Sequence, residues 1–430
     1  FGATWSELQA GLRDGPQATI ARLLQGGPGL EAFETQTASL ARSAARANDG
    51  KQAGAWWLYR MLYSPHPLRE KLTLFWHNHF ATSNAKVRNA RHMLGQYRLM
   101  HEHALGSFKK MLVAMGTDPA MLIWLDTIQS VKGKPNENYA RELMELFSLG
   151  IGHYTEADIR EAARAFTGYQ IVGGKSKFNS YWHDAGDKTV FGKTGRFMGE
   201  DIAEACLAQP ACAKFIAGKL YRFLIAETAS PAPEVIDSLA ELYRKADYDT
   251  GTLVATMLRS RLFFSPQSYR AKIKSPVELA VGIIRGMEGT AGPLPLAGIL
   301  DGLGQVLFAP PSVKGWDGGT AWLNAQTLLS RNNLALALTS TEGIGFGSRC
   351  DPAKLLAAHG KSGDAEVVDF LLGVFLQGDV PAESRTKLLD YLKTAKAAKF
   401  PVYWTADDVK NHRYRAVAHL VLTLPEFQLA

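Results

Sequence analysis

The sequence predicts a mainly α-helical fold, built as one large domain with a small hairpin-bearing insertion around residues 169–200. Apolar residues recur at three- and four-residue steps along most of the chain, which is the period of a helix packed against a core. Glycine or proline stands at the ends of these periodic segments, where helices commonly begin and stop. The 430 residues, 46% of them hydrophobic, exceed the usual size of a single core. An alternative division is therefore an N-terminal helical part (1–168), the insertion, and a C-terminal helical part (201–430).

The predicted helices of the first third follow in chain order. Residues 4–15 and 16–27 are periodic segments that each end on glycine, as helix C-termini often do. Residues 67–83 open with a proline, which the first turn of a helix accepts. A long helix is expected around residues 91–115, and a short one around residues 119–125.

Two further helices precede the insertion. The first is expected to begin at Asn136 and to end at Gly150 or Gly152. The second opens at Thr155 with a Thr-x-x-Asp capping signature and closes on Gly168.

Residues 169–200 break this helical rhythm. Glycine turns separate short runs of aromatic and β-branched residues there, which predicts a hairpin. Helices resume over residues 201–259 and again from Ser275. Residues 308–324, FAPPSVKGWDGGTAWLN, form a loop whose rigid turns and aromatic residues favour a binding rim over a linker. Two or three helices finish the chain.

Composition limits the function classes. Forty-eight basic and 41 acidic residues give a net charge of +7, which suits an anionic substrate or surface. No lysine- or arginine-rich block is present, so nucleic acid is not the expected partner. No apolar run approaches the roughly 18 residues of a membrane helix. Because the chain starts at Phe1, we expect that an upstream segment was removed, of which a secretory signal is one explanation. Cys206 and Cys212 are either a disulfide or buried free thiols.

The stretch FWHNHFATSNAK, residues 75–86, mixes polar and aromatic side chains on one predicted helix. His77 and His79 lie about 200° apart on a helix, so they cannot bind one metal ion from the same face. His79 falls on the apolar stripe and is either a core histidine bonded to a carbonyl or a pocket residue. His77 points elsewhere and could face a cavity or water.

The segment NENYARELMEL carries a dense set of charges. Glu137, Arg141 and Glu145 are successive i, i+4 neighbours, so the arginine can bridge both carboxylates. Asn138 and Glu142 lie on an adjacent polar strip. The segment is either a solvated helix face or a carboxylate held beside an arginine for proton transfer.

A third polar cluster lies in the insertion. YWHDAGDK, residues 181–188, places His183, Asp184 and Lys188 beside aromatic residues. A His-Asp pair can orient an imidazole as a base or supply metal ligands, although a polar turn explains the same residues.

Several long strings occur in one order along the chain. They are LREKLTLFWHNHFATS, PNENYARELMELFSLGIGHYTEADIREAARAFTG, FIAGKLYRFL, IKSPVELAVGIIRG and FAPPSVKGWDGGTAWLN. Together they resemble the bacterial family called domain of unknown function 1800, from the opening FGAT almost to the C-terminus. The resemblance implies a secreted or periplasmic protein, because members typically carry export signals. It also implies a sulfatase-like companion protein, since many members are encoded near one. No catalytic residue is implied.

We expect an exported bacterial enzyme that hydrolyses an extracellular polymer, with a glycan as the leading class, by carboxylate acid–base chemistry. The helices carrying residues 75–80 and 136–145 would wall a pocket, and the insertion would cover it. The expected catalytic residues are Glu137, Glu142, His183 and Asp184. The expected substrate-binding residues are Trp76, His77, Asn78, His79, Asn136, Asn138, Arg141, Trp182, Lys188 and Trp316. The tryptophans of this set, together with Trp322, could stack on sugar rings.

Two other hypotheses remain open on the sequence. One is a metal-dependent enzyme whose ligands are His77 or His79, His183, Asp184 and a glutamate. No other cofactor is expected. The second is a non-catalytic binding or assembly protein that works with the sulfatase-like companion through its aromatic loops.

Overall fold

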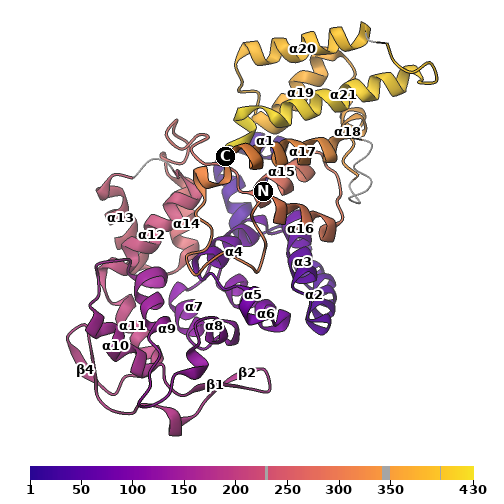
Figure 1. Ribbon diagram of the computed structural model, residues 1–430. Coiled ribbons are helices and arrows are strands. Elements are labelled where there is room, and N and C mark those ends of the chain that lie inside the picture. The colour runs from indigo at the N-terminus through magenta and orange to yellow at the C-terminus, as the bar shows by residue number, and fades with distance from the viewer. Residues whose placement is uncertain (228–230, 341–348, 398) are drawn as a thin grey trace.

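The computed structural model describes residues 1–227, 231–340, 349–397 and 399–430 (Figure 1). The chain is 64% helical, and its two sheets are small antiparallel pairs. The predicted mainly α-helical class with a hairpin-bearing insertion is therefore confirmed. Among the helices within these ranges, none combines the length and the hydrophobicity that crossing a bilayer would require.

The N-terminal helices agree with the sequence in outline and differ at one break. They are α1 (Trp5–Gln25), α2 (Leu30–Ala47), α3 (Gly50–Tyr63), α4 (Pro67–His79), α5 (Asn84–Val87), α6 (Ala90–Glu102), α7 (Phe108–Met115) and α8 (Pro119–Trp124). The two predicted helices 4–15 and 16–27 are both found within α1, where Gly15 has a non-helical φ of 79° and ψ of 172° and separates them by a kink. The predicted helix 91–115 is broken between α6 and α7. There, Gly106 and Phe108 form backbone hydrogen bonds with residues 248–250, which an unbroken helix could not do.

A π-helix begins near the end of the NENYARELMEL segment. The segment contains α9 (Asn138–Glu142) and enters the π-helix Leu143–Ser148, and α10 (Glu156–Ala165) follows. In the π-helix the Leu149 N–H donates to the Met144 carbonyl, five residues back, at 2.9 Å. α10 begins with the predicted capping box between Thr155 and Asp158.

Two hairpins make up the insertion. β1 (Tyr169–Val172) pairs with β2 (Lys175–Phe178), and β3 (Lys188–Val190) pairs with β4 (Lys193–Gly195). Each pair is joined by two residues with positive φ, which is the geometry that the right-handed twist of a hairpin favours.

The remaining elements complete the helical scaffold. They are α11 (Gly199–Leu207), α12 (Pro210–Leu224), α13 (Pro233–Lys245), α14 (Thr250–Arg259), α15 (Pro276–Gly286), α16 (Pro293–Gly302), α17 (Ala325–Thr339), α18 (Pro352–Ala358), α19 (Asp364–Leu376), α20 (Ala382–Ala397), α21 (Ala406–Thr423) and short 3-10 turns at Thr127–Gln129, Ser180–Trp182, Gly319–Trp322 and Pro425–Gln428. α15 follows Ser275, close to the predicted start, and Ser275 caps it in a capping box with Glu278. Cys206 and Cys212 are buried free thiols.

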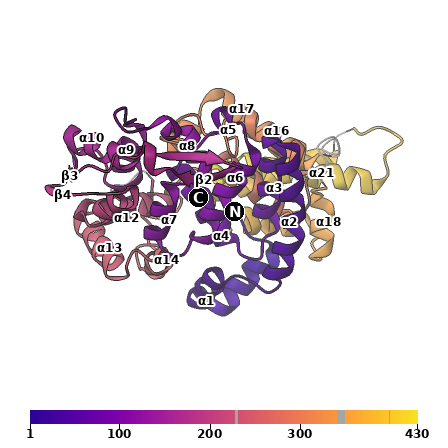
Figure 2. The same ribbon diagram turned by 90° about the horizontal axis from the view of Figure 1, so that it is seen from below.

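Two hydrophobic clusters hold the molecule together, and α4 contributes to both. One gathers α2, α3 and the helices from α15 onwards, with Leu74 of α4; the other gathers α7 to α14, with Leu72 and Trp76 of α4. Each cluster draws on residues from both sides of the insertion. In both views of the molecule, β3 and β4 lie at one end, α18–α21 at the other, and α4 between them (Figures 1 and 2).

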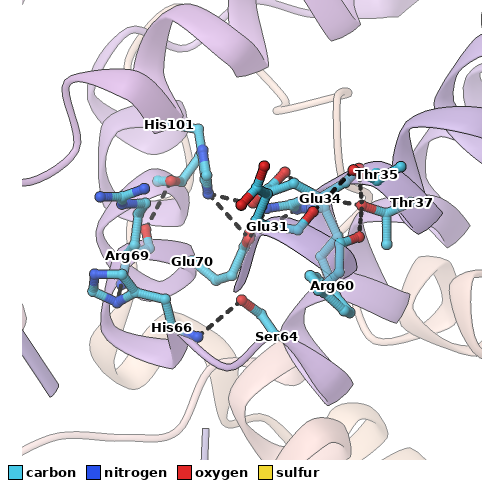
Figure 3. Close-up of polar contacts among 12 residues, drawn as sticks. Glu31, Glu34, Thr35, Thr37, Arg60, Ser64, His66, Arg69, Glu70 and His101 are labelled. Atoms are coloured by element: carbon cyan, nitrogen blue, oxygen red, sulfur yellow. Dashed lines mark hydrogen bonds and ion pairs between the residues drawn. The ribbon is translucent and has the colours of Figure 1, made fainter. Parts of the chain in front are cut away.

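A buried ion pair fastens α4 to its neighbours (Figure 3). Glu70 is fully buried and accepts hydrogen bonds from the Arg60 guanidinium at 2.8 Å, the Trp57 indole at 3.1 Å and the Tyr97 hydroxyl at 2.8 Å. Burial raises the pKa of Glu70, but the His101 hydrogen bond and the Arg60 charge outweigh it, so the pKa lies below its ordinary value. The carboxylate is therefore ionised and its hydrogen-bonding capacity is filled, which marks it as structural.

Candidate functional site

The two histidines of α4 hold other segments in place. His79 Nε2 donates to the Phe147 carbonyl at 3.0 Å, and His77 Nε2 accepts the Phe308 backbone N–H at 3.1 Å. Burial lowers the pKa of His77 to about 3 and that of His79 well below its ordinary value, so both rings are neutral at pH 7. The interpretation of His79 as a core histidine bonded to a carbonyl is confirmed. His77, expected to face a cavity or water, is instead buried.

Asn78, between them, fixes the loop that follows Phe308. Its Oδ1 accepts the Trp316 N–H at 2.7 Å, and its Nδ2 donates to the Trp316 carbonyl at 3.2 Å. The backbone approaches closely here, because a Cβ on Gly315 would overlap Asn78 Oδ1. Asn78 therefore links α4 to residues 308–324, the predicted binding rim, through these two hydrogen bonds.

The tryptophans expected to bind substrate differ in how far their side chains are exposed. Trp76 is fully buried, packs on Phe108 and donates its indole N–H to the Ala104 carbonyl at 3.1 Å. It therefore cannot stack on a sugar, which corrects that expectation. Trp316 and Trp322 are 8% and 9% exposed, whereas Trp182 is 40% exposed in the insertion.

Glu142 is the half-buried carboxylate of the polar segment. Burial, together with the neighbouring Glu145 charge, raises the pKa of Glu142, while Arg141 and Lys314 oppose that rise. Tyr154 donates its hydroxyl to Glu145 at 2.7 Å. Lys314 comes from the loop that Asn78 holds, so the structure brings Glu142 and this loop together.

The other residues of the segment are held by local contacts near the surface. Arg141 donates to both oxygens of Glu156 at 2.8 and 2.7 Å and to Glu137 at 3.4 Å. Asn136 Oδ1 accepts the Asn138 N–H at 2.9 Å, which forms a turn at the start of α9. Glu137 is therefore an ion-pair partner of Arg141.

The third predicted cluster, His183, Asp184 and Lys188, is bound to α10 through Arg164. Asp184 accepts from Arg164 Nε at 2.8 Å and from the Gly186 N–H at 3.0 Å, and the Arg164 guanidinium lowers the pKa of Asp184 to about 2. His183 is buried with Nδ1 3.0 Å from the Thr167 carbonyl. Lys188 is 1% exposed and donates to the Asp184 and Gly186 carbonyls at 2.6 and 3.0 Å.

Two of the three predicted clusters are therefore joined, through the end of α4, the π-helix and residues 308–324. No hydrogen bond or ion pair in the described chain links His183 or Asp184 to Glu142, and both residues have their partners on or beside α10. Likewise, within the described ranges no group of three His, Cys, Asp or Glu residues is placed to hold a metal ion.

Sequence reasoning missed a cavity that opens beside Asn78. A small hollow of about 70 Å³ lies next to one of about 840 Å³, and Phe223, Lys272 and Glu278 line both. Asn78, Trp316, Trp322 and Glu227 also line the small hollow. The larger volume falls within the range of small-molecule sites.

The charged groups of this cavity have shifted pKa values. Glu278 is buried and accepts from Lys71 Nζ at 2.5 Å, and although burial opposes it, the charges of Lys71 and Lys272 hold the pKa of Glu278 well below its ordinary value. Burial lowers the pKa of Lys272 to about 8 and that of Lys274 to about 7. One signal was present in the sequence, since IKSPVELAV places Lys274 and Glu278 at the start of an otherwise apolar helix.

The fold is thus a mainly helical scaffold that carries a half-buried carboxylate and a partly charged cavity. The chain belongs to the family described as Protein of unknown function (DUF1800), whose model matches residues 1–429. No curated protein and no solved structure matches the chain.

Proposed function

We propose that this chain is an exported bacterial hydrolase that cleaves an extracellular polymer, with a glycan as the expected class, by carboxylate acid–base chemistry. Glu142 acts as the general acid in this proposal. Glu145 replaces Asp184 and Glu137 as the second carboxylate, because those two residues are engaged by Arg164 and Arg141.

The environment of Glu142 is the observation that carries the proposal. A general acid must hold its proton near the working pH, and burial beside another carboxylate raises the pKa in that direction. The π-helix supports the same assignment, since such segments are frequent at functional sites. Arg141 and Lys314 supply positive charge for an anionic or hydroxyl-rich substrate.

Glu142→Gln should lower the release of reducing ends from soluble polysaccharides by about a hundredfold, because general acid catalysis typically contributes at least that factor. Wild-type protein is first assayed on alginate, carboxymethylcellulose, dextran and xylan. Glu241→Gln is the matched control, since Glu241 is an exposed helical glutamate paired with Lys245. Equal turnover in Glu142→Gln and wild type would refute the role of Glu142. Saturable polymer binding without turnover by wild type would instead favour the binding-protein hypothesis.

Lys314→Gln should move the alkaline limb of the pH–rate profile to higher pH. The Lys314 charge lowers the pKa of Glu142, so its removal lets Glu142 keep its proton at higher pH. Activity is lost as the pH rises through that pKa, because a general acid works when protonated. Lys314 is exposed, so screening limits the shift to about a few tenths of a pH unit. The profile of kcat/KM measures it, and a shift to lower pH would contradict the assignment.

A further inference from the structure

One ammonium group in the larger cavity donates no hydrogen bond, although the charges of Glu278 and Glu227 act on it. Lys272 is 8% exposed, and its Nζ forms no hydrogen bond or ion pair with any residue of the described chain. This Nζ lies 4.9 Å from the centre of the Phe223 ring, which lines both hollows. Burying a charged amine costs free energy unless something pairs with it.

The other cationic side chains around this cavity are already engaged. Lys71 pairs with Glu278, and Lys274 donates to the Phe427 carbonyl at 2.8 Å. Arg270 donates to the Leu376 and Asp379 carbonyls. Among the lysine and arginine side chains that line this cavity in the described chain, Lys272 is therefore the one that has no hydrogen-bond acceptor and can donate to a ligand.

The rest of the lining is mostly apolar. It is contributed by α1, α4, α12, α14, α19 and the segments beside them, and includes Leu8, Leu23, Leu68, Phe223, Phe263 and Phe375. An apolar wall with one ammonium that has no hydrogen-bond acceptor fits a ligand with an apolar body and a charged end.

We propose that this cavity binds a carboxylate carried on an apolar chain, with the carboxylate on Lys272 Nζ and the chain along the leucine and phenylalanine wall. One ammonium without a hydrogen-bond acceptor can pair directly with one carboxylate. Glu278 and Glu227, whose charges act on Lys272, repel each added negative charge, so a singly charged head is favoured over a doubly charged one. The lowered pKa of Lys272, about 8, leaves most of the amine protonated at pH 7 and so able to pair.

Calorimetric titration with sodium dodecanoate tests the assignment on the full chain. Wild-type protein should bind one equivalent of dodecanoate at least about tenfold more tightly than dodecanol, which has the same chain without the charge. Sodium acetate, which has the charge without the chain, should bind no more than weakly. Equal affinity for dodecanoate and dodecanol, or tight binding of acetate, would overturn the proposal.

Lys272→Met should remove the preference for dodecanoate over dodecanol, and Lys272→Arg should keep it. Lys393→Met, on the exposed face of α20, is the matched control and should bind like wild type. Because Nζ donates no hydrogen bond and Lys71 still pairs with Glu278, the melting temperature of Lys272→Met should stay within about 5 °C of wild type. A fall of more than about 5 °C would show that Nζ holds the fold instead and would refute the proposal.

Discussion

Glu70→Ala is expected to destabilise the protein by about 3–5 kcal/mol, the cost of breaking a buried ion pair by removing one partner. Glu70 is fully buried, and the variant leaves the Arg60 Nε, the Trp57 indole and the Tyr97 hydroxyl without their acceptor. Each buried donor that loses its acceptor costs about 1–3 kcal/mol. The free energy of unfolding from urea titration at pH 7 measures the effect.

Arg60 limits the loss, since it keeps a second partner. Its two terminal nitrogens donate to both oxygens of Glu34 at 2.8 and 2.6 Å, so its charge remains paired in the variant (Figure 3). Glu241→Ala, an exposed glutamate replaced in the same way, should leave the stability unchanged. A loss below about 1 kcal/mol for Glu70→Ala would mean that water or rearrangement satisfies the buried donors.

The stability that the Glu70–Arg60 ion pair contributes should decrease in acid. The folded-state pKa of Glu70 lies below its ordinary value of 4.5, so ionised Glu70 contributes stability at pH values above 4.5. That contribution is lost as the pH falls through the folded-state pKa. The difference in stability between wild type and Glu70→Ala should therefore shrink below pH 4.5. A difference that grows with acid would contradict the ionised state.

Local signals made the helix boundaries predictable. Pro67 at the first turn of α4, the Thr155 capping box of α10 and the start of α15 at Ser275 are all found as predicted. Each depends on residues within one turn, so sequence spacing is sufficient. The break between α6 and α7 depends on backbone pairing with residues 248–250, and no local pattern encodes such a distant partner.

The residues of the candidate site could be predicted only where they lie within one continuous segment of the sequence. Glu142 could be selected because its charged neighbours lie within the same helix. Asp184 was expected beside it, but Arg164 on α10 satisfies that carboxylate instead. Lys272 gave no signal, since its lack of a hydrogen-bond acceptor arises from the packing of segments scattered from α1 to the C-terminus. A missing acceptor is a property of the fold and cannot be read from residue spacing.

Gly315→Ala is expected to destabilise the segment 308–324 by about 3 kcal/mol. Gly315 has a φ of 83°, and this left-handed conformation costs an alanine about 1–2 kcal/mol. The new Cβ would also overlap Asn78 Oδ1 and lie 2.5 Å from the Asn78 carbonyl oxygen, so the loop must move away. That movement breaks both hydrogen bonds between Asn78 and Trp316, at about 0.5–1.5 kcal/mol each. Hydrogen exchange of the Trp316 amide measures the loss, as a fall in protection of about a hundredfold.

Gly304→Ala separates the clash from the backbone strain. Gly304 has a φ of 87°, and an alanine Cβ at this position would have no atom within 4 Å, so this variant bears the conformational cost alone. Exchange at Trp316 should stay unchanged in that control. Because the same loop carries Lys314 to Glu142, Gly315→Ala should also move the alkaline limb of the rate profile upwards, as Lys314→Gln does. Normal Trp316 protection in Gly315→Ala would mean that the Asn78 hydrogen bonds do not hold the loop. Other contacts would then have to keep the Lys314 charge near Glu142.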